Sequence, residues 1–184
     1  TGHGVPGAFM SLLNIGFLSE AIKEKNIEKP NEIFNYVRNR LISTISEGGQ
    51  KDGMDGILIC LEQNNRTIEY AAANNAPVLI KKNEIIELQK DRMPVGKGEK
   101  NLDFTLYTIE LEKNDTLFLY TDGYADQFGG PKGKKFKYKS LNELLLNNVD
   151  LDLMSQKNEI EQTFISWKGN LEQVDDVLII GVKI

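Results

Sequence analysis

Residues 117–126, LFLYTDGYAD, place two aspartates directly after an apolar run that is typical of a β-strand. Residues 174–180, VDDVLII, show the reverse order, with Asp175 and Asp176 directly before another such run. Carboxylates at strand ends are held by a stiff backbone, and hard divalent cations prefer oxygen ligands of this kind. Two such cations about 4 Å apart can activate a water molecule and hold a phosphoryl group. The two acidic turns therefore predict a metal site shared by distant parts of the chain.

The spacing within each turn supports this reading and leaves alternatives. Asp126 follows Asp122 by four residues, so both lie on one side of the chain if a helical turn begins there. No basic residue separates them, and the two charges repel unless a cation or a proton is present. An ordinary Asp-Gly turn and a solvated strand start remain alternatives, because neighbouring residues on an extended chain point to opposite sides. Residues 52–55, DGMD, are interpreted as a turn rather than as ligands.

Composition limits the class of protein. A length of 184 residues predicts one domain, and a net charge of −5 argues against sequence-independent nucleic-acid binding. One cysteine, Cys60, excludes an internal disulfide and favours a reducing, cytoplasmic compartment. No apolar run approaches the roughly 20 residues of a membrane span, so we expect no membrane contact by this domain. The densest basic cluster contains Lys132, Lys134 and Lys135.

The hydrophobic pattern changes from helical to strand-like and back along the chain. Helices are predicted near residues 9–25, 33–45, 141–147 and 156–167. Strands are predicted at residues 56–62, 67–73, 77–81, 84–88, 104–111, 116–120 and 177–183, with turns at 64–65 and 82–83 and loops at 93–96 and 129–139. The order of helix pair, strand meander, helices and final strand favours an α+β fold with antiparallel pairing.

The chain begins in a glycine-rich segment, residues 2–7, GHGVPG. The spacing matches a dinucleotide fingerprint, but a helix pair follows it where a helix and a strand would be required. A tight glycine turn at a helix N-terminus, where anions are favoured, is the better interpretation. His3 is the only histidine, so it can form neither a catalytic triad nor a histidine-rich metal site.

Five motifs in a fixed order carry a family resemblance. They are residues 1–11 (TGHGVPGAFMS), 52–55 (DGMD), 72–77 (AANNAP), 121–130 (TDGYADQFGG) and 174–177 (VDDV). Over residues 1–184 the chain resembles the stage II sporulation protein E branch of the metal-dependent, protein phosphatase 2C-like serine/threonine phosphatases. The resemblance implies two antiparallel sheets in a sandwich flanked by helices, with two Mn²⁺ or Mg²⁺ ions at one edge. It also implies that a metal-bridging hydroxide attacks phosphoserine or phosphothreonine, with no covalent enzyme intermediate.

The resemblance assigns roles residue by residue. Asp122 and Asp175 match metal-ligand aspartates, and Asp126 matches a position that serves a weaker third metal. We expect supporting roles for Gly123, Asp176, Gly2 and His3, and the resemblance leaves the specific role of His3 open. The family places a further metal-ligating aspartate two positions before Thr1 and its first strands further upstream. We therefore expect a catalytic domain that lacks its N-terminal strands, with weak metal binding and little activity.

The leading hypothesis is metal-dependent hydrolysis of phosphoserine or phosphothreonine on a regulatory protein, such as a phosphorylated anti-sigma-factor antagonist. The domain would be the output of a bacterial signalling protein with an upstream sensor domain. The alternative is a non-catalytic, phosphatase-like binding module, although a degenerate copy is expected to lose some of its aspartates. The lysine cluster is expected to lie on a mobile loop that attracts an acidic, phosphorylated surface, or else to be a solvated connector. Absent N-terminal strands would leave residues 177–183 as a free edge that pairs two copies.

Overall fold

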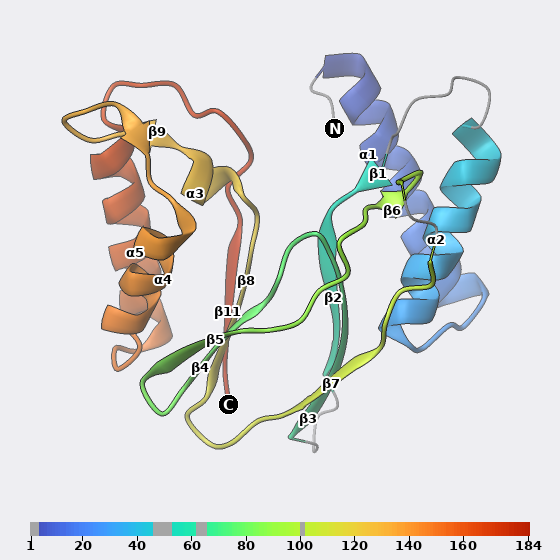
Figure 1. Cartoon of the computed structure of the whole chain (residues 1–184), viewed down its shortest axis with the longest axis horizontal. Helices are drawn as coiled ribbons and strands as arrows, with labels where there is room; N and C mark the ends of the chain where they lie inside the picture. The colour runs from blue at the N-terminus through green and yellow to red at the C-terminus, as the bar shows by residue number, and fades with distance from the viewer. Residues whose placement is uncertain (1–3, 46–52, 62–65, 100–101) are drawn as a thin grey trace. The chain divides into compact units, whose positions relative to one another are not determined.

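The computed structural model describes residues 4–45, 53–61, 66–99 and 102–184, and the chain forms two compact units (Figure 1). Unit 1 comprises Thr1–Ala76 and Gln89–Leu111, and unit 2 comprises Pro77–Leu88 and Glu112–Ile184. Each unit combines an antiparallel sheet with its own pair of helices. The predicted α+β class, with two antiparallel sheets and flanking helices, is confirmed.

Unit 1 packs two helices against a three-stranded sheet. The helices are α1 (Gly4–Ser19), which continues as the π-helical turn η1 (Glu20–Glu24), and α2 (Pro30–Ile45). The sheet has the order β2 (Gly56–Leu61), β3 (Thr67–Ala73) and β7 (Tyr107–Glu110). Phe34, Val37 and Leu41 recur at helical spacing on α2 and enter a core that also contains Ala71 and Ala73 of β3.

A pair of short strands in unit 1 corrects two predictions. β1 (Gly53–Met54) pairs with β6 (Val95–Gly96), although we expected a turn and a loop at these positions. The two backbones approach closely, because a Cβ atom on Gly53 would lie 2.9 Å from the Val95 carbonyl oxygen. Only glycine permits this contact, and two residues are too few to show an alternating pattern in the sequence.

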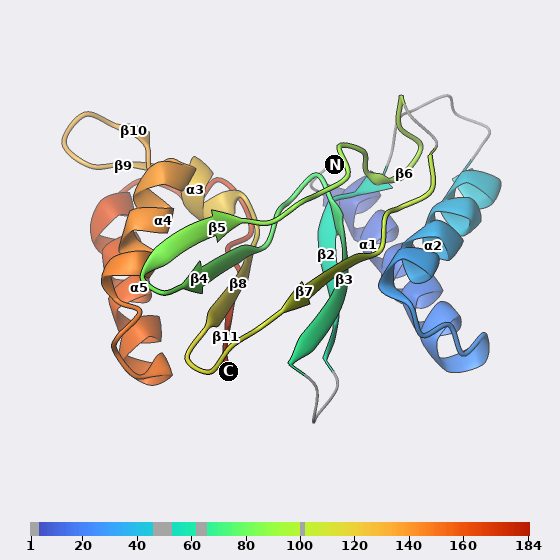
Figure 2. The ribbon, with the colours of Figure 1, turned by 60° about the horizontal axis from the view of Figure 1, so that its bottom comes forward.

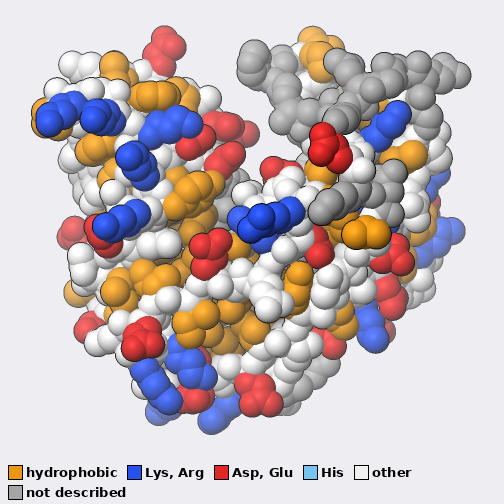
Figure 3. Space-filling view, in the orientation of Figure 1, with side chains coloured by type: hydrophobic (Ala, Val, Ile, Leu, Met, Phe, Trp, Pro, Cys, Tyr) orange, Lys and Arg blue, Asp and Glu red, His pale blue; other side chains and the backbone are white. Residues whose placement is uncertain are grey.

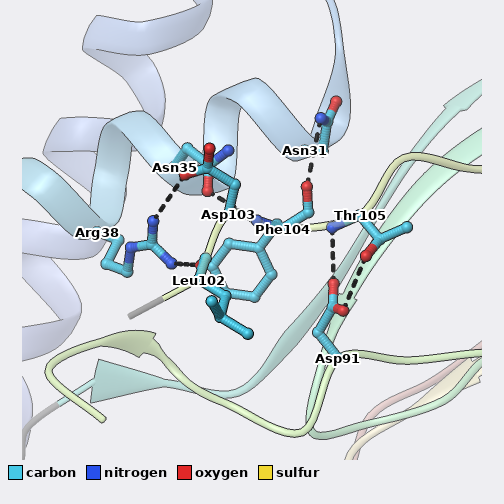
Figure 4. Close-up of polar contacts among 8 residues, drawn as sticks. All are labelled: Asn31, Asn35, Arg38, Asp91, Leu102, Asp103, Phe104 and Thr105. Atoms are coloured by element: carbon cyan, nitrogen blue, oxygen red, sulfur yellow. Dashed lines mark hydrogen bonds and ion pairs between the residues drawn. The ribbon is translucent and has the colours of Figure 1, made fainter. Parts of the chain in front are cut away.

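Side chains of α2 hold the segment before β7 (Figure 4). Asn35 accepts a hydrogen bond from the Phe104 backbone N–H at 2.9 Å, and the Arg38 guanidinium lies 5.3 Å from the centre of the Phe104 ring. Asp91 accepts from the backbone N–H and the hydroxyl of Thr105, at 2.8 and 3.0 Å. These backbone groups are satisfied by side chains instead of a neighbouring strand. The strand predicted at residues 104–111 therefore begins only at Tyr107.

The first helix is more apolar than we expected. Val5–Glu24 spans 20 residues, with a mean hydropathy of 1.4 over an 18-residue window. By length and composition it meets the criterion for a membrane span, so the expectation that no such run exists was wrong. Phe17 and Ala21 of this helix are buried in the unit 1 core, while Val5 and Leu12 are 84% and 70% exposed.

Unit 2 contains a four-stranded sheet in the order β11, β8, β4, β5 (Figures 1 and 2). The strands are β4 (Val78–Lys81), β5 (Glu84–Glu87), β8 (Thr116–Tyr120) and β11 (Ile179–Lys183). The helices α4 (Tyr138–Asn147) and α5 (Leu153–Lys168) pack against it. Ile80, Phe118, Leu141 and Leu145 are buried between these layers. The single helical turn α3 (Gly123–Asp126) and the hairpin of β9 (Phe128–Gly129) and β10 (Lys134–Lys135) join β8 to α4.

Local sequence signals explain the ends of several elements in unit 2. Lys82 and Asn83 both have positive φ values, 52° and 60°, which is the backbone geometry of a two-residue hairpin turn between β4 and β5. Asp152 caps α5 by accepting hydrogen bonds from the backbone N–H groups of Met154 and Ser155, each at 3.0 Å. The final strand, predicted at residues 177–183, begins at Ile179.

Candidate metal centre

The first acidic turn follows directly from the end of β8. Thr121 and Asp122 leave the strand, and α3 begins at Gly123. The backbone N–H of Asp126 donates to the Asp122 carbonyl oxygen at 2.9 Å, which closes one helical turn. Residues four apart on such a turn share a face, so Asp122 and Asp126 lie on the same side of the chain. The helical turn that the metal-site hypothesis required is therefore present.

Backbone contacts bring the second acidic turn against the first. A Cβ atom built on Gly123 would lie 2.3 Å from the carbonyl oxygen of Asp176 and 3.3 Å from the carbonyl carbon of Asp175. The Thr121 hydroxyl donates to the Asp176 carbonyl oxygen at 2.8 Å and accepts from the Leu178 N–H at 3.0 Å. Residues that are more than 50 positions apart in sequence thus form one junction at the end of the β8–β11 pair.

The segment that carries Asp175 and Asp176 has no regular secondary structure, and both residues are exposed. The Asp175 carboxylate accepts a hydrogen bond from the Asp176 backbone N–H at 2.7 Å, through Oδ1. Its carbonyl oxygen accepts from the Gln173 side-chain amide at 2.8 Å. These contacts fix the Asp175 side chain beside its own turn.

Lys135 forms an ion pair with Asp126. The Lys135 ammonium nitrogen lies 3.0 Å from Asp126 Oδ2, and the two side chains are 46% and 42% exposed. A pair exposed to this extent stabilises the fold only slightly, because solvent screens the attraction. Lys135 nevertheless places a positive charge on the carboxylate that the resemblance assigns to a weak third metal.

The lysine cluster lies on a hairpin, where we expected a loop without strand pairing; the mobility of this segment stays a prediction. β9 and β10 pair Gly129 with Lys134 and Phe128 with Lys135. The Gly130 N–H donates to the Trp167 carbonyl oxygen at 2.8 Å, so the hairpin is held against the end of α5. Figure 3 shows basic side chains gathered over this hairpin, with acidic side chains beside them. Gly129 and Gly130 pack directly against Trp167, so neither position has room for a Cβ atom.

Two neighbouring features do not belong to the acidic junction. Burial raises the pKa of Tyr124, so its phenol stays neutral, and its hydroxyl donates to the Ile160 carbonyl oxygen at 2.8 Å. A groove of about 530 Å³ between α5 and β11 is lined mainly by apolar residues such as Phe164 and Val177. None of the four aspartates lines this groove.

The residues that are present fit a divalent cation in kind but form only part of a coordination shell. Asp122, Asp126, Asp175 and Asp176 offer the carboxylate oxygens that Mg²⁺ and Mn²⁺ prefer. Within residues 4–45, 53–61, 66–99 and 102–184, however, no group of three or more His, Cys, Asp or Glu side chains is arranged to hold a metal ion. The junction therefore supplies a partial oxygen-ligand set.

The remaining candidate residues from the sequence lie away from the junction or outside the described part of the chain. Gly2 and His3 lie outside the described residues, as does Asp52. Asp55 accepts a hydrogen bond from the Asn74 side chain at 2.8 Å, which agrees with its interpretation as a turn residue.

Two residues at the junction had no role predicted from the sequence. Thr121 was noted only for its place in a motif, although its hydroxyl joins the two turns. Gln127 lies in the same motif and was likewise given no role, and it is completely buried beside the junction. Neither residue carries a charge, so neither fits the sequence pattern of acidic metal ligands.

Comparisons with known proteins agree on one fold. The SiaA-PP2C domain of Pseudomonas aeruginosa is 27% identical to this chain, with a TM-score of 0.88, and the match covers 100% of this chain and 72% of that domain. A Bacillus subtilis SpoIIE structure with the PP2C phosphatase domain and a regulatory fragment is 17% identical, with a TM-score of 0.71, and the match covers 100% and 52% of the two chains. The Mycobacterium tuberculosis serine/threonine phosphatase PstP/Ppp is 13% identical, with a TM-score of 0.61 and coverage of 100% and 85%.

No curated protein sequence matches the chain. The family model for stage II sporulation protein E, in contrast, matches residues 1–184, which is the whole chain. The motif order, the α+β fold and the junction of the two acidic turns agree with this match. The chain therefore belongs to the stage II sporulation protein E (SpoIIE) family of PP2C-type phosphatase domains.

Proposed function

We propose that this chain is the catalytic part of a metal-dependent phosphatase that removes phosphate from phosphoserine or phosphothreonine on a regulatory protein. The observation that carries the proposal is the contact between the two acidic turns, where Gly123 packs against the Asp176 carbonyl group. This contact brings the segment of Asp122 and Asp126 to the segment of Asp175. Carboxylates that approach one another at this junction would repel, and a bound cation would relieve that repulsion.

Asp122 and Asp175 would hold the cation, and Asp176 would support the Asp175 turn through its backbone. Bound Mn²⁺ or Mg²⁺ would supply Lewis-acid chemistry, which lowers the pKa of a water and neutralises phosphoryl charge. Among structures that share this fold, RsbX is described in complex with magnesium. The bonds from Thr121 to Asp176 and Leu178 would hold the Asp175 segment near Asp122, so less ordering entropy would be lost when a cation binds.

The hairpin would receive the phosphorylated protein. Lys132, Lys134 and Lys135 are exposed or half-exposed, and Lys135 touches Asp126 at the junction. Their charges would attract an acidic, phosphorylated surface such as that of a phosphorylated anti-sigma-factor antagonist. The domain would then act in the cytoplasm as the output of a bacterial signalling protein that carries a sensor domain.

The test measures Mn²⁺ binding and phosphoester hydrolysis separately. Mn²⁺ titration calorimetry on this chain should show weaker binding for Asp122→Asn and Asp175→Asn than for the unchanged chain, with unchanged circular dichroism. Hydrolysis of a phosphothreonine peptide, measured in the longest natural polypeptide that contains the chain, should fall at least 100-fold in both variants. Asp150→Asn is the control, because this exposed aspartate lies outside the junction and should change neither quantity.

Each result has a definite meaning. Full activity of Asp175→Asn at saturating Mn²⁺ would contradict the ligand assignment, and Asp176→Asn would be tested next. A polypeptide that binds the phosphorylated protein but does not hydrolyse it at saturating Mn²⁺ would instead be the non-catalytic, phosphatase-like module.

A further inference from the structure

Gln127 is a buried polar residue that touches the segments beside both acidic turns. It directly follows Asp126 at the end of α3, and none of its surface is exposed. Its side-chain nitrogen donates to the carbonyl oxygens of Phe128 and Glu172, at 3.0 and 2.9 Å. Its side-chain oxygen accepts from the Val174 N–H at 3.3 Å. One amide therefore binds the loop that leads directly into Asp175.

The backbone of Gln127 is fixed as firmly as its side chain. Its carbonyl oxygen accepts from the Phe136 N–H and from the Trp167 indole N–H, each at 3.0 Å. Phe136 continues from β10, and Trp167 lies near the end of α5. The backbone of Gln127 is thus anchored to Phe136 and Trp167, while its side chain binds the loop of Glu172 and Val174.

This hydrogen-bond pattern requires an amide. The loop presents a carbonyl oxygen at Glu172 and an N–H at Val174, so its partner must both donate and accept. A glutamate at position 127 would direct an unprotonated oxygen at the Glu172 carbonyl oxygen, and a methionine would make neither bond. Burial makes either loss costly, because no water replaces the missing partner.

We propose that Gln127 is a positioning residue of the candidate metal centre. Its side chain holds the Asp175 turn in position against the turn of Asp122 and Asp126. It acts through the backbone of residues 172–174 and contacts neither metal nor substrate. Its effect on metal binding rests on the proposed phosphatase function, whereas its effect on the loop does not. Partners that orient metal ligands typically change metal affinity 10- to 100-fold when they are removed.

The chain offers a matched control at Gln156 on α5. Gln156 is 2% exposed, and its side-chain nitrogen also donates to two backbone carbonyl oxygens, those of Val149 and Leu151, at 3.3 and 2.9 Å. It lies in the same unit but bonds the connection between α4 and α5 instead of the acidic loop. Gln127→Glu and Gln156→Glu therefore make the same chemical change at two buried sites.

The first experiment measures hydrogen–deuterium exchange without metal. Gln127→Glu should speed exchange of the backbone amides in residues 172–178 at least 10-fold, while Gln156→Glu should leave that segment unchanged and speed exchange around residues 149–156. Gln127→Met, which keeps the volume, is measured as a second variant in case the glutamate prevents folding. Unchanged exchange at residues 172–178, or equal acceleration by the two glutamate variants, would overturn the proposal.

The second experiment titrates Mn²⁺ by calorimetry in the same proteins. Gln127→Glu should weaken binding about 10-fold or more, with Gln156→Glu unchanged. In the longest natural polypeptide that contains the chain, saturating Mn²⁺ should restore most of kcat while the metal requirement stays raised. Equal Mn²⁺ affinity in the two variants would overturn the role in metal binding. Failure of the longest natural polypeptide that contains the chain to bind Mn²⁺ would refute the proposed function alone, and the exchange result would still decide whether Gln127 positions the loop.

Discussion

Thr121 and Asp176 belong to different acidic turns, 55 residues apart, and the Thr121 hydroxyl donates to the Asp176 carbonyl oxygen at 2.8 Å. The same hydroxyl accepts from the Leu178 N–H at 3.0 Å, and the Thr121 N–H donates to the Leu178 carbonyl oxygen at 3.1 Å. These bonds continue the pairing of β8 with β11 beyond Tyr120 and Ile179, as far as the backbone of Asp176. The Thr121 side chain therefore links the two turns by hydrogen bonds.

Thr121→Val keeps the shape of the side chain and removes both hydroxyl bonds. The free energy of unfolding should fall by about 1–2 kcal/mol, because each intramolecular hydrogen bond contributes about 1 kcal/mol. Urea denaturation measures this change. Thr108→Val, at an exposed position of β7, is the control and should change stability by less than about 0.5 kcal/mol. Equal effects of the two substitutions would contradict the role given to Thr121.

Gly123→Ala should separate the two acidic turns. Its Cβ atom would lie 2.3 Å from the Asp176 carbonyl oxygen, a contact that only a backbone shift can relieve. Stability should fall by about 1–3 kcal/mol, as in other overpacked sites, and Mn²⁺ binding should weaken with it. Gly16→Ala is the matched control, since no atom lies within 4 Å of the new methyl group and the position is helical. That change should stabilise the protein by about 0.5–1 kcal/mol; a stabilising Gly123→Ala would refute the contact.

The hairpin lysines should divide into two functional groups. Lys135→Ala removes the charge beside Asp126, so Mn²⁺ affinity should rise up to about fivefold, which matches the small contribution of an exposed ion pair. Lys132→Ala combined with Lys134→Ala should instead raise KM for a phosphoprotein and leave KM for an aryl phosphate unchanged. Lys139→Ala, an exposed lysine on α4, is the control for loss of charge. Equal changes of KM for both substrates would support a connector without a role in recognition.

Acid should weaken the cap of α5. Hydrogen bonds from the Ser155 side chain and backbone lower the pKa of Asp152 below its ordinary value of 3.8. A carboxyl group with a lowered pKa stabilises the fold above pH 3.8, and this contribution is lost as the pH falls through the folded-state pKa. Asp152→Ala should therefore lower Tm at about pH 6, and the difference from the unchanged protein should shrink below pH 3.8. A difference that stays constant as the pH is lowered through this range would argue against the charged cap.

The free edge of β11 should allow two copies to associate. Among the described residues β11 pairs with β8 alone, and Ile180 is 45% exposed. The opposite edge strand, β5, is better protected, since Glu84 and Glu87 lie at its ends. Light scattering should show a concentration-dependent dimer that Ile180→Lys abolishes and Ile86→Lys on β5 preserves. A monomer at all concentrations, or loss of the dimer in both variants, would refute pairing through β11.

The sequence predicts best those elements whose ends carry their own signals. β3 and β8 have the predicted bounds, because alternating or apolar residues fill them and turn residues flank them. The strand before Tyr107 was predicted too long, since Asn35 and Asp91 bind its backbone from elsewhere in unit 1. No periodicity reveals a hairpin with two paired positions such as β9 and β10.

Only part of the candidate metal centre can likewise be predicted from the sequence. Carboxylates after strand ends are visible in the sequence, and the family resemblance assigns Asp122 and Asp175 to one site. The contacts that join the turns are tertiary, and they are made largely by backbone atoms and uncharged side chains. A glutamine after a short helix has no distinguishing pattern, so Gln127 becomes visible only when its three side-chain hydrogen bonds are seen.

The path of the chain between the two units has a consequence for biosynthesis. The chain changes unit after residues 76, 88 and 111, so β4 and β5 are made before the rest of unit 2. Among the described strands, β7 completes the β2–β3–β7 sheet of unit 1. Val78 of β4, in contrast, meets its partner Phe118 only when β8 has been made, and Phe118 meets Gly181 only when β11 has been made. A nascent chain therefore carries an unfinished unit 2 sheet until β11 is translated, and a ribosome that stalls before β11 would release a protein with an exposed β8 edge. Chaperones would therefore matter most for this domain in the interval between the synthesis of β8 and that of β11.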